Sequence, residues 1–220
     1  MAPLSKRLQV ALSYLQGATY LADIGCDHGY LPIEAIKSKI VSKAIASDNK
    51  IEPYLKAKAN IEFENLSHMI EAKHQEGIVN LPAAVDAISI LGMGGEVMVQ
   101  ILENGCLDNI KILVLGPNSE AKQVRYFLKN NHYKIDDEAF IIDHNHYYQI
   151  IRAIKGEMHL TPLEATYGPL NIQRQTKELL AFVNHEITKL TKSLEHASEA
   201  SKLEIITKIN EMRGVFNELN

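Results

Sequence analysis

Short, continuous apolar runs alternate with segments of helical spacing through the first two thirds of the chain. The apolar runs are 20–24, 44–48, 87–91 and 112–115, and the helical segments include 53–65, 95–102 and 119–130. Runs of this kind are typical of strands buried on both faces of a parallel sheet. Their alternation with helices predicts a doubly wound α/β sheet.

Two β-rich runs follow each other closely after this region, at 138–142 and 147–154, with Asp143-His144-Asn145-His146 between them. This spacing predicts an antiparallel hairpin that closes one edge of the sheet. Two alternating histidines in a hairpin are more often surface residues than metal ligands, so we expect no metal site.

The pattern changes after Gly156. Thr161-Pro162 and Gly168-Pro169 indicate a linker. Two apolar stripes with spacings of three and four follow it, separated by a predicted turn at 195–201. The stripes are Leu179, Val183, Ile187, Leu190 and Leu194, then Leu203, Ile206, Ile209, Met212 and Phe216. They predict an antiparallel, coiled-coil-like helical hairpin. We therefore divide the chain into a sheet domain, 1–157, and a helical hairpin domain, 158–220.

The composition is that of a globular protein, with 220 residues of which 46% are hydrophobic. No apolar run approaches the roughly 18–20 residues that span a bilayer, and residues 1–9 lack the apolar core of a signal peptide. The two cysteines, Cys26 and Cys106, form neither a C-x-x-C motif nor a disulfide framework. We expect a cytoplasmic protein with no membrane partner.

The most informative motif follows the first predicted strand: Asp23-Ile24-Gly25-Cys26-Asp27-His28-Gly29-Tyr30. A strand that ends in a glycine turn and opens a helix makes a site for a nucleotide-like ligand. The spacing is Asp-x-Gly-x-x-x-Gly, which differs from the Gly-x-Gly-x-x-Gly that binds a pyrophosphate. The carboxylates of Asp23 and Asp27 suit the ammonium and sulfonium of S-adenosylmethionine. The loop's cofactor-binding candidates are Asp23, Gly25, Cys26, Asp27, Gly29 and Tyr30. Cys26 is expected to be a small buried side chain, because nothing near it would activate a thiolate.

A second acid, Asp48, ends the second predicted strand and is followed by Asn49. An acid at this position can bind both ribose hydroxyls of a nucleoside, so both residues are cofactor candidates. The alternative role for Asp48 is to cap the next helix. Asp48 fits NAD equally well, but together with the acid-rich loop it favours a methyltransferase over a nicotinamide-dependent oxidoreductase.

Two further turns are expected to lie beside the reacting atoms. The strand at 87–91 ends in Gly92-Met93-Gly94-Gly95, whose glycines leave room for a flat ring or simply form a tight turn. We assign Gly92 to the cofactor, and Met93 and Gly94 to the substrate. Asn118, after the strand at 112–115, can hydrogen-bond a base edge or cap the following helix, and both roles stay open.

The net charge of −4 does not indicate a nucleic-acid-binding protein. Residues 1–60 are nevertheless basic, with eight Lys/Arg and five Asp/Glu. A phosphate-facing patch there would include Lys6 and Arg7, our candidates for substrate contacts, although a solvated surface explains the same charges.

Three of these motifs together resemble the bacterial tRNA (adenine-22-N1)-methyltransferases: Asp-Ile-Gly-Cys-Asp-His-Gly-Tyr-Leu-Pro at 23–32, Gly-Met-Gly-Gly at 92–95 and Leu-Gly-Pro-Asn at 115–118. Val-Arg-Tyr-Phe-Leu at 124–128 and Tyr-Gly-Pro-Leu at 167–170 fit the same family, so the resemblance covers essentially the whole chain. It implies a Rossmann-like class I methyltransferase sheet with a C-terminal helical coiled-coil domain. It also implies S-adenosylmethionine as cofactor and N1 of an adenine in the D-arm region of tRNA as the methyl acceptor.

The chain departs from the family pattern at two places. Glu76-Gly77-Ile78 stands where the family has Asn/Asp-Gly-Leu, and Gly116 stands where it has Gln before Pro-Asn. Glu76 and Gly77 are cofactor-binding candidates, and the first departure leaves open which residue holds the cofactor's adenine. The second departure affects a substrate contact.

Adenine chemistry limits what the protein must supply. N1 of neutral adenine already carries a lone pair, so positioning and a nearby negative group suffice, and a general base is optional. Asp27, His28 and Asn118 are the candidates for this pocket, while Asp27 can equally bind the cofactor and His28 can simply stack. The remaining alternative is a non-catalytic RNA-binding module that kept the fold. No obligate protein partner is implied.

Overall fold

The computed structural model describes residues 4–144 and 146–217, except the side chains of residues 199, 200, 216 and 217. The chain divides into two compact units, Met1–His159 and Leu160–Asn220. The domain boundary expected from the sequence lies between 157 and 158.

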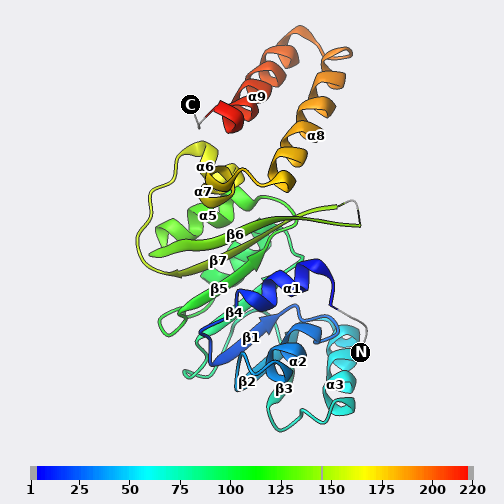
Figure 1. Cartoon of the computed structure of the whole chain (residues 1–220). Helices are drawn as coiled ribbons and strands as arrows, with labels where there is room; N and C mark the ends of the chain where they lie inside the picture. The colour runs from blue at the N-terminus through cyan, green and yellow to red at the C-terminus, as the bar shows by residue number, and fades with distance from the viewer. Residues whose placement is uncertain (1–3, 145, 218–220) are drawn as a thin grey trace. The chain divides into compact units, whose positions relative to one another are not determined.

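The first unit is built on a seven-stranded sheet with the order β3-β2-β1-β4-β5-β7-β6 (Figure 1). Strands β1 to β5 pair in parallel, whereas β7 runs antiparallel to both β5 and β6. The strands are β1 (Tyr20–Ile24), β2 (Lys43–Asp48), β3 (Ile70–His74), β4 (Ala87–Leu91), β5 (Ile112–Gly116), β6 (Tyr133–Asp143) and β7 (His146–Lys155). This arrangement confirms the predicted α/β sheet and its closing hairpin.

In the described part of the first unit, the sheet is accompanied by the helices α1 (Lys6–Ser13), α2 (Tyr30–Lys37), α3 (Ile51–Phe63), α4 (Gly95–Glu103) and α5 (Ala121–Asn130). Helix α1 packs against α2, and α4 packs against α5. The sequence analysis did not predict α1, which Ser5 caps by accepting the Leu8 N–H at 3.4 Å. None of the helices in the described ranges is long and apolar enough to cross a membrane.

The strand order reverses between β1 and β4, which lie side by side at the centre of the sheet. Ala22 of β1, Ile45 of β2 and Ile88 of β4 are fully buried in register with one another. Because open parallel sheets bind ligands at the carboxyl ends of strands where the order reverses, the turns after β1, β2 and β4 define the expected site.

A buried ion pair connects α5 to the closing hairpin. The Arg125 side chain donates from Nε and Nη2 to one Glu138 oxygen, at 3.2 and 2.8 Å, and from Nη2 to Gln149 Oε1 at 2.8 Å. Both charged side chains are 0% exposed. Since neither charge has access to water, each depends on its partner for stabilisation.

The second unit begins with two short helices, α6 (Pro162–Tyr167) and α7 (Pro169–Arg174). The sequence analysis read this segment as a linker, which is wrong because each proline occupies the first turn of a helix, where its missing N–H has no cost. Thr161 and Glu164 form a reciprocal capping box at the start of α6.

A helical hairpin follows, formed by α8 (Lys177–Leu194) and α9 (Glu199–Asn217), which pack against each other (Figure 1). Leu179, Val183, Ile209 and Met212 of the predicted stripes are buried. Leu203 is 72% exposed and Ile206 is 45% exposed. Ile187, Leu190 and Leu194 are half-buried. The side chain of Phe216 lies outside the described residues. The connecting turn is also shorter than predicted, since α9 begins at Glu199.

Candidate active site

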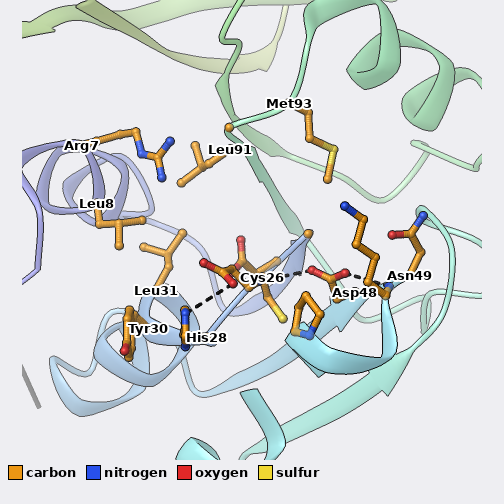
Figure 2. A pocket seen from close by; sticks show the side chains of 16 residues that line it. Arg7, Leu8, Cys26, His28, Tyr30, Leu31, Asp48, Asn49, Leu91 and Met93 are labelled. Carbon is orange, nitrogen blue, oxygen red and sulfur yellow. Dashed lines mark hydrogen bonds and ion pairs between the residues drawn. The ribbon is translucent and has the colours of Figure 1, made fainter. Parts of the chain in front are cut away.

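Two adjoining cavities lie where β1, β2 and β4 end. The first, of about 350 Å³, is lined by acids and by apolar side chains of α1 and α2; the second has about 610 Å³. Both linings include Gly25, Asn49, Lys50 and Met93. Of the candidate residues, the first cavity is also lined by Arg7, Asp23, Cys26, Asp27, His28, Tyr30, Asp48 and Gly92, and the second by Glu76 and Gly77 (Figure 2).

Asp23 is the most buried acid of the first cavity, with 4% of its surface exposed. It lies opposite Ser89 in the register of β1 and β4, and the Ser89 hydroxyl donates to its Oδ1 at 2.6 Å. Burial raises the pKa of Asp23 to about 7, the Ser89 hydrogen bond opposes this shift, and the charge of Asp48 adds to it. Asp23 therefore changes its charge near neutral pH.

Asp48 is 8% exposed and accepts two backbone hydrogen bonds. Lys50 N–H donates to Oδ1 at 2.9 Å, and Asp27 N–H donates to Oδ2 at 3.4 Å. The N-cap of α3 is Lys50, with no side-chain cap, so the alternative role of Asp48 as helix cap is wrong. Its carboxylate instead connects the turn after β2 to the acid-rich loop.

The acid-rich loop uses left-handed backbone conformations at three of its residues. Gly25, Asp27 and Gly29 have φ of 70°, 50° and 71°. A Cβ on Gly25 would lie 2.2 Å from the Met93 side chain, so the glycine permits this close approach. Gly29 is the N-cap of α2 and lies against Ala57 of α3, outside both cavity linings.

The His28 ring is fixed by stacking. It lies 5.1 Å from the Tyr30 ring with planes 7° apart, and its Nε2 is 3.6 Å from Asp27 Oδ1. Asn60 Nδ2 donates to the His28 carbonyl at 2.9 Å. The Asp27 side chain is 71% exposed, so the acid and the imidazole present a polar, accessible wall to the cavity.

Asn118 supports the glycine turn after β4. Its Nδ2 donates to the Gly92 carbonyl at 2.7 Å, and its N–H donates to the Met93 carbonyl at 2.8 Å. The N-cap of α5 is Glu120, so the predicted alternative of a helix cap is wrong for Asn118. Asn118 and Gly94 lie outside both cavity linings.

The second cavity is more apolar and contains residues that the sequence analysis missed. Gln75 N–H donates to the Asp48 carbonyl at 3.1 Å, and Gln75 Nε2 donates to the Val79 carbonyl at 2.9 Å. Ile78 and Val97 supply apolar surface. In this part of the sequence only the turn at Gly77 indicated a ligand site. The strand before it, β3, was not predicted, because its residues do not form an apolar run.

The two basic candidates are separated by the structure. Arg7 lines the first cavity, with its guanidinium carbon 5.2 Å from the centre of the Tyr148 ring. Lys6 is exposed and outside both linings. Sequence reasoning missed the contact of Tyr148 with Arg7. It also missed the apolar side chains of Leu8 and Leu91, which lie beside Arg7 in the first cavity (Figure 2).

Cys26 is buried, and its burial, with smaller effects of Asp23 and Asp48, raises the pKa of its thiol, so it remains protonated at neutral pH. In the described ranges no group of three or more His, Cys, Asp or Glu side chains could bind a metal ion. His144 and His146 are exposed at the end of the hairpin.

Changing Asp23 to Asn should stabilise the ligand-free protein more at pH 8 than at pH 5. The folded pKa of Asp23, about 7, lies above its ordinary value of 3.8. The stability that Asp23 contributes is therefore fully present below about pH 4 and is lost as the pH rises through about 7. Thermal unfolding of both proteins at the two pH values measures this. An equal shift of Tm at both would contradict the burial cost.

The sheet order and the acid-lined cleft define a Rossmann-like class I methyltransferase, and comparisons with known proteins agree. Residues 4–151 match a family described as a methyltransferase domain. The tRNA (adenine(22)-N(1))-methyltransferase of Bacillus subtilis is 36% identical over 157 residues, which span 70% of this chain and 66% of that protein, just under two thirds of its length.

Two solved structures extend the similarity to nearly the whole chain. A putative tRNA (m1A22) methyltransferase of Streptococcus pneumoniae, in complex with S-adenosyl-L-methionine, is 28% identical with a TM-score of 0.91, covering 97% of this chain and 99% of that one. M. capricolum TrmK, in complex with S-adenosyl-homocysteine, is 28% identical with a TM-score of 0.89, covering 99% of each chain. The chain belongs to the methyltransferase domain family, and the predicted resemblance to the bacterial tRNA (adenine-22-N1)-methyltransferases is confirmed.

Proposed function

We propose that this protein transfers the methyl group of S-adenosylmethionine to N1 of adenine 22 in tRNA. The observation that carries the proposal is the acid-lined cleft at the ends of β1, β2 and β4, in a chain whose relatives are named for this reaction. A cytoplasmic location and tRNA as partner are part of the proposal.

The residues present fit S-adenosylmethionine in chemistry and arrangement. Asp48, with both oxygens already oriented by backbone N–H groups, would hold the ribose hydroxyls. Asp23 would face the ammonium of the methionine part, because a buried carboxylate gains most from a cation. The apolar second cavity, with Gly77, Ile78 and Val97, would take the adenine. When bound, the cofactor supplies an electrophilic methyl group.

The protein's part in the reaction is positioning and charge stabilisation. The N1 lone pair of the target adenine would accept the methyl group of the bound cofactor, and the residues that line the two cavities would hold the base and the cofactor in line. The methylated ring is cationic until its exocyclic amine loses a proton. Asp27, accessible at the cavity wall and close to His28, would stabilise this charge. Asn118 would act through the Gly92–Met93 turn that it holds.

Methylation of unmodified tRNA in vitro, followed by mapping of the modified base through reverse-transcription stops, tests the proposal. A stop at position 22 is expected, and it should disappear when adenine 22 is replaced by guanine. Tight cofactor binding without methyl transfer to tRNA would instead favour a non-catalytic RNA-binding module. A response to NADH would favour the oxidoreductase.

Removing residues 160–220 should separate cofactor binding from substrate capture. We expect near-normal cofactor affinity, because every proposed cofactor residue and both cavities belong to the first unit. Methylation of full-length tRNA should fall strongly, because a large RNA needs a second anchoring surface to hold one base in line. Circular dichroism and calorimetric titration must first show an intact fold. Full-length activity in the truncated protein would contradict this division of roles.

A further inference from the structure

Arg7 differs from the other arginines of the first unit, Arg125 and Arg152, because those two form ion pairs with acids. Arg125 is paired with Glu138, and Arg152 is paired with Asp136 while also donating to the carbonyls of Tyr14 and Gln16. Among the described residues, no carboxylate forms an ion pair with Arg7, although it is half-buried and lines the first cavity. A half-buried cation without an acid partner has lost part of its hydration, so contact with a bound ligand would offset that cost.

The guanidinium of Arg7 is nevertheless held in place. One support is the Tyr148 ring on β7, 5.2 Å from the guanidinium carbon, a distance typical of a cation–π contact. The other is the turn after β4, since a Cβ on Gly92 would lie 3.2 Å from Arg7 Nη1. Arg7 of α1 therefore places its planar, charged guanidinium between β7 of the closing hairpin and the glycine turn after β4. The reacting base is expected to lie beside this turn.

The surroundings of Arg7 suit a flat heteroaromatic ring better than a phosphate. Leu8 and Leu91 lie beside it in the cavity lining, and Leu31 faces them from α2 (Figure 2). The three acids of the lining, Asp23, Asp27 and Asp48, outnumber its two cations, Arg7 and Lys50, so the cavity would repel a phosphate. Lys6, the adjacent cation, is exposed and outside the cavity, where a backbone phosphate could reach it.

We infer that Arg7, supported by Tyr148, is the platform on which the target purine ring stacks, and that it does not act mainly as a phosphate contact. The inference deepens the proposed function and rests on it. Guanidinium planes and aromatic rings are common stacking surfaces for unstacked bases in RNA recognition. Arg7 and Tyr148 therefore position the target base. Asp27, which lines the same cavity, stabilises the positive charge that develops on the methylated ring.

The test compares variants that separate charge from planarity. Arg7→Lys keeps the charge but loses the planar surface, and it should lower kcat for tRNA methylation by about tenfold to a hundredfold, the range expected for loss of one base stack. Tyr148→Leu should lower kcat to a similar extent, and Tyr148→Phe, which keeps the ring, should recover most of that loss. The dissociation constant for tRNA should change far less than kcat in all three variants.

Salt dependence distinguishes a stacking platform from a phosphate contact. Arg7→Gln should leave the log–log salt slope of tRNA binding unaltered, whereas loss of a phosphate contact would reduce it by about 0.7. Lys6→Gln is the comparison, because its exposed ammonium has the placement of a phosphate contact. Thermal unfolding and calorimetric cofactor titration establish that each variant is folded with an intact cofactor site.

Three outcomes overturn the inference. Wild-type kcat in Arg7→Lys would show that only charge matters, and a reduced salt slope in Arg7→Gln would assign Arg7 to a phosphate. Failure of Tyr148→Phe to recover activity would remove Tyr148 as the ring support. The proposed function fails separately, through absence of methyl transfer by the wild-type protein, and the platform would fail with it.

Discussion

Replacing Arg125 by methionine should lower the free energy of unfolding by about 3–5 kcal/mol, the range for breaking a buried ion pair by removing one partner. Glu138 would remain fully buried without its cation, and Gln149 would lose a hydrogen bond at 2.8 Å. The packing of α5 against the β6–β7 hairpin would be weakened, because the ion pair that connects them is lost. Urea denaturation of the two proteins, followed by circular dichroism, measures the difference.

The matched control for this variant is the double substitution Arg125→Met with Glu138→Leu. Because two apolar side chains of similar volume leave no unpaired charge, the double variant should recover most of the lost stability. A loss below about 1 kcal/mol in the single variant would mean that water reaches Glu138 and that the pair is a minor contribution.

Replacing Asp48 by alanine should weaken S-adenosylmethionine binding by about 1.5–3 kcal/mol, the range for hydrogen bonds to a charged group. The carboxylate is buried, oriented by the N–H groups of Asp27 and Lys50, and positioned at the end of β2 in the lining of the first cavity. Isothermal titration calorimetry gives the affinity directly. Asp23→Ala is expected to have an effect of the same size.

Asp86 offers a matched control for Asp48. It is similarly buried, 7% exposed, and its Oδ1 accepts the N–H groups of Thr19 and Tyr20 at 2.9 Å, but it lies at the opposite end of the strands. Asp86→Ala should therefore destabilise the fold without changing cofactor affinity. Equal affinity in the Asp48 variant and the wild type, with the fold intact, would remove Asp48 from the cofactor site.

The strands and helices that could be predicted from the sequence are those whose hydrophobic pattern is evident within the segment itself. β1, β4 and β5 are short apolar runs, as expected of strands that are almost entirely buried. β3, with Glu71 and Lys73, lies at the sheet edge and carries no such pattern. The short helices α6 and α7 were read as a linker because prolines mark both helix starts and loops.

The candidate site was predictable to the extent that its residues follow strands. Asp23 and Asp48 end neighbouring strands, so their proximity follows from parallel pairing. The partners that fix them do not show in the sequence: Ser89 is 66 residues from Asp23, and Tyr148 meets Arg7 only because α1 and β7 pack together. The amide of Asn118 bonds a carbonyl of another turn, which no local pattern indicates.

The close approach of Gly25 and Met93 has a consequence for substitution at position 25. The methionine side chain occupies the space that any side chain at position 25 would need, and it borders both cavities. A larger residue at position 25 would therefore require the flexible Met93 side chain to move away, at the junction where the cofactor's two halves would meet. The φ of 70° at Gly25 disfavours such a residue independently of Met93, so the first turn is constrained by its own backbone as well as by its neighbour.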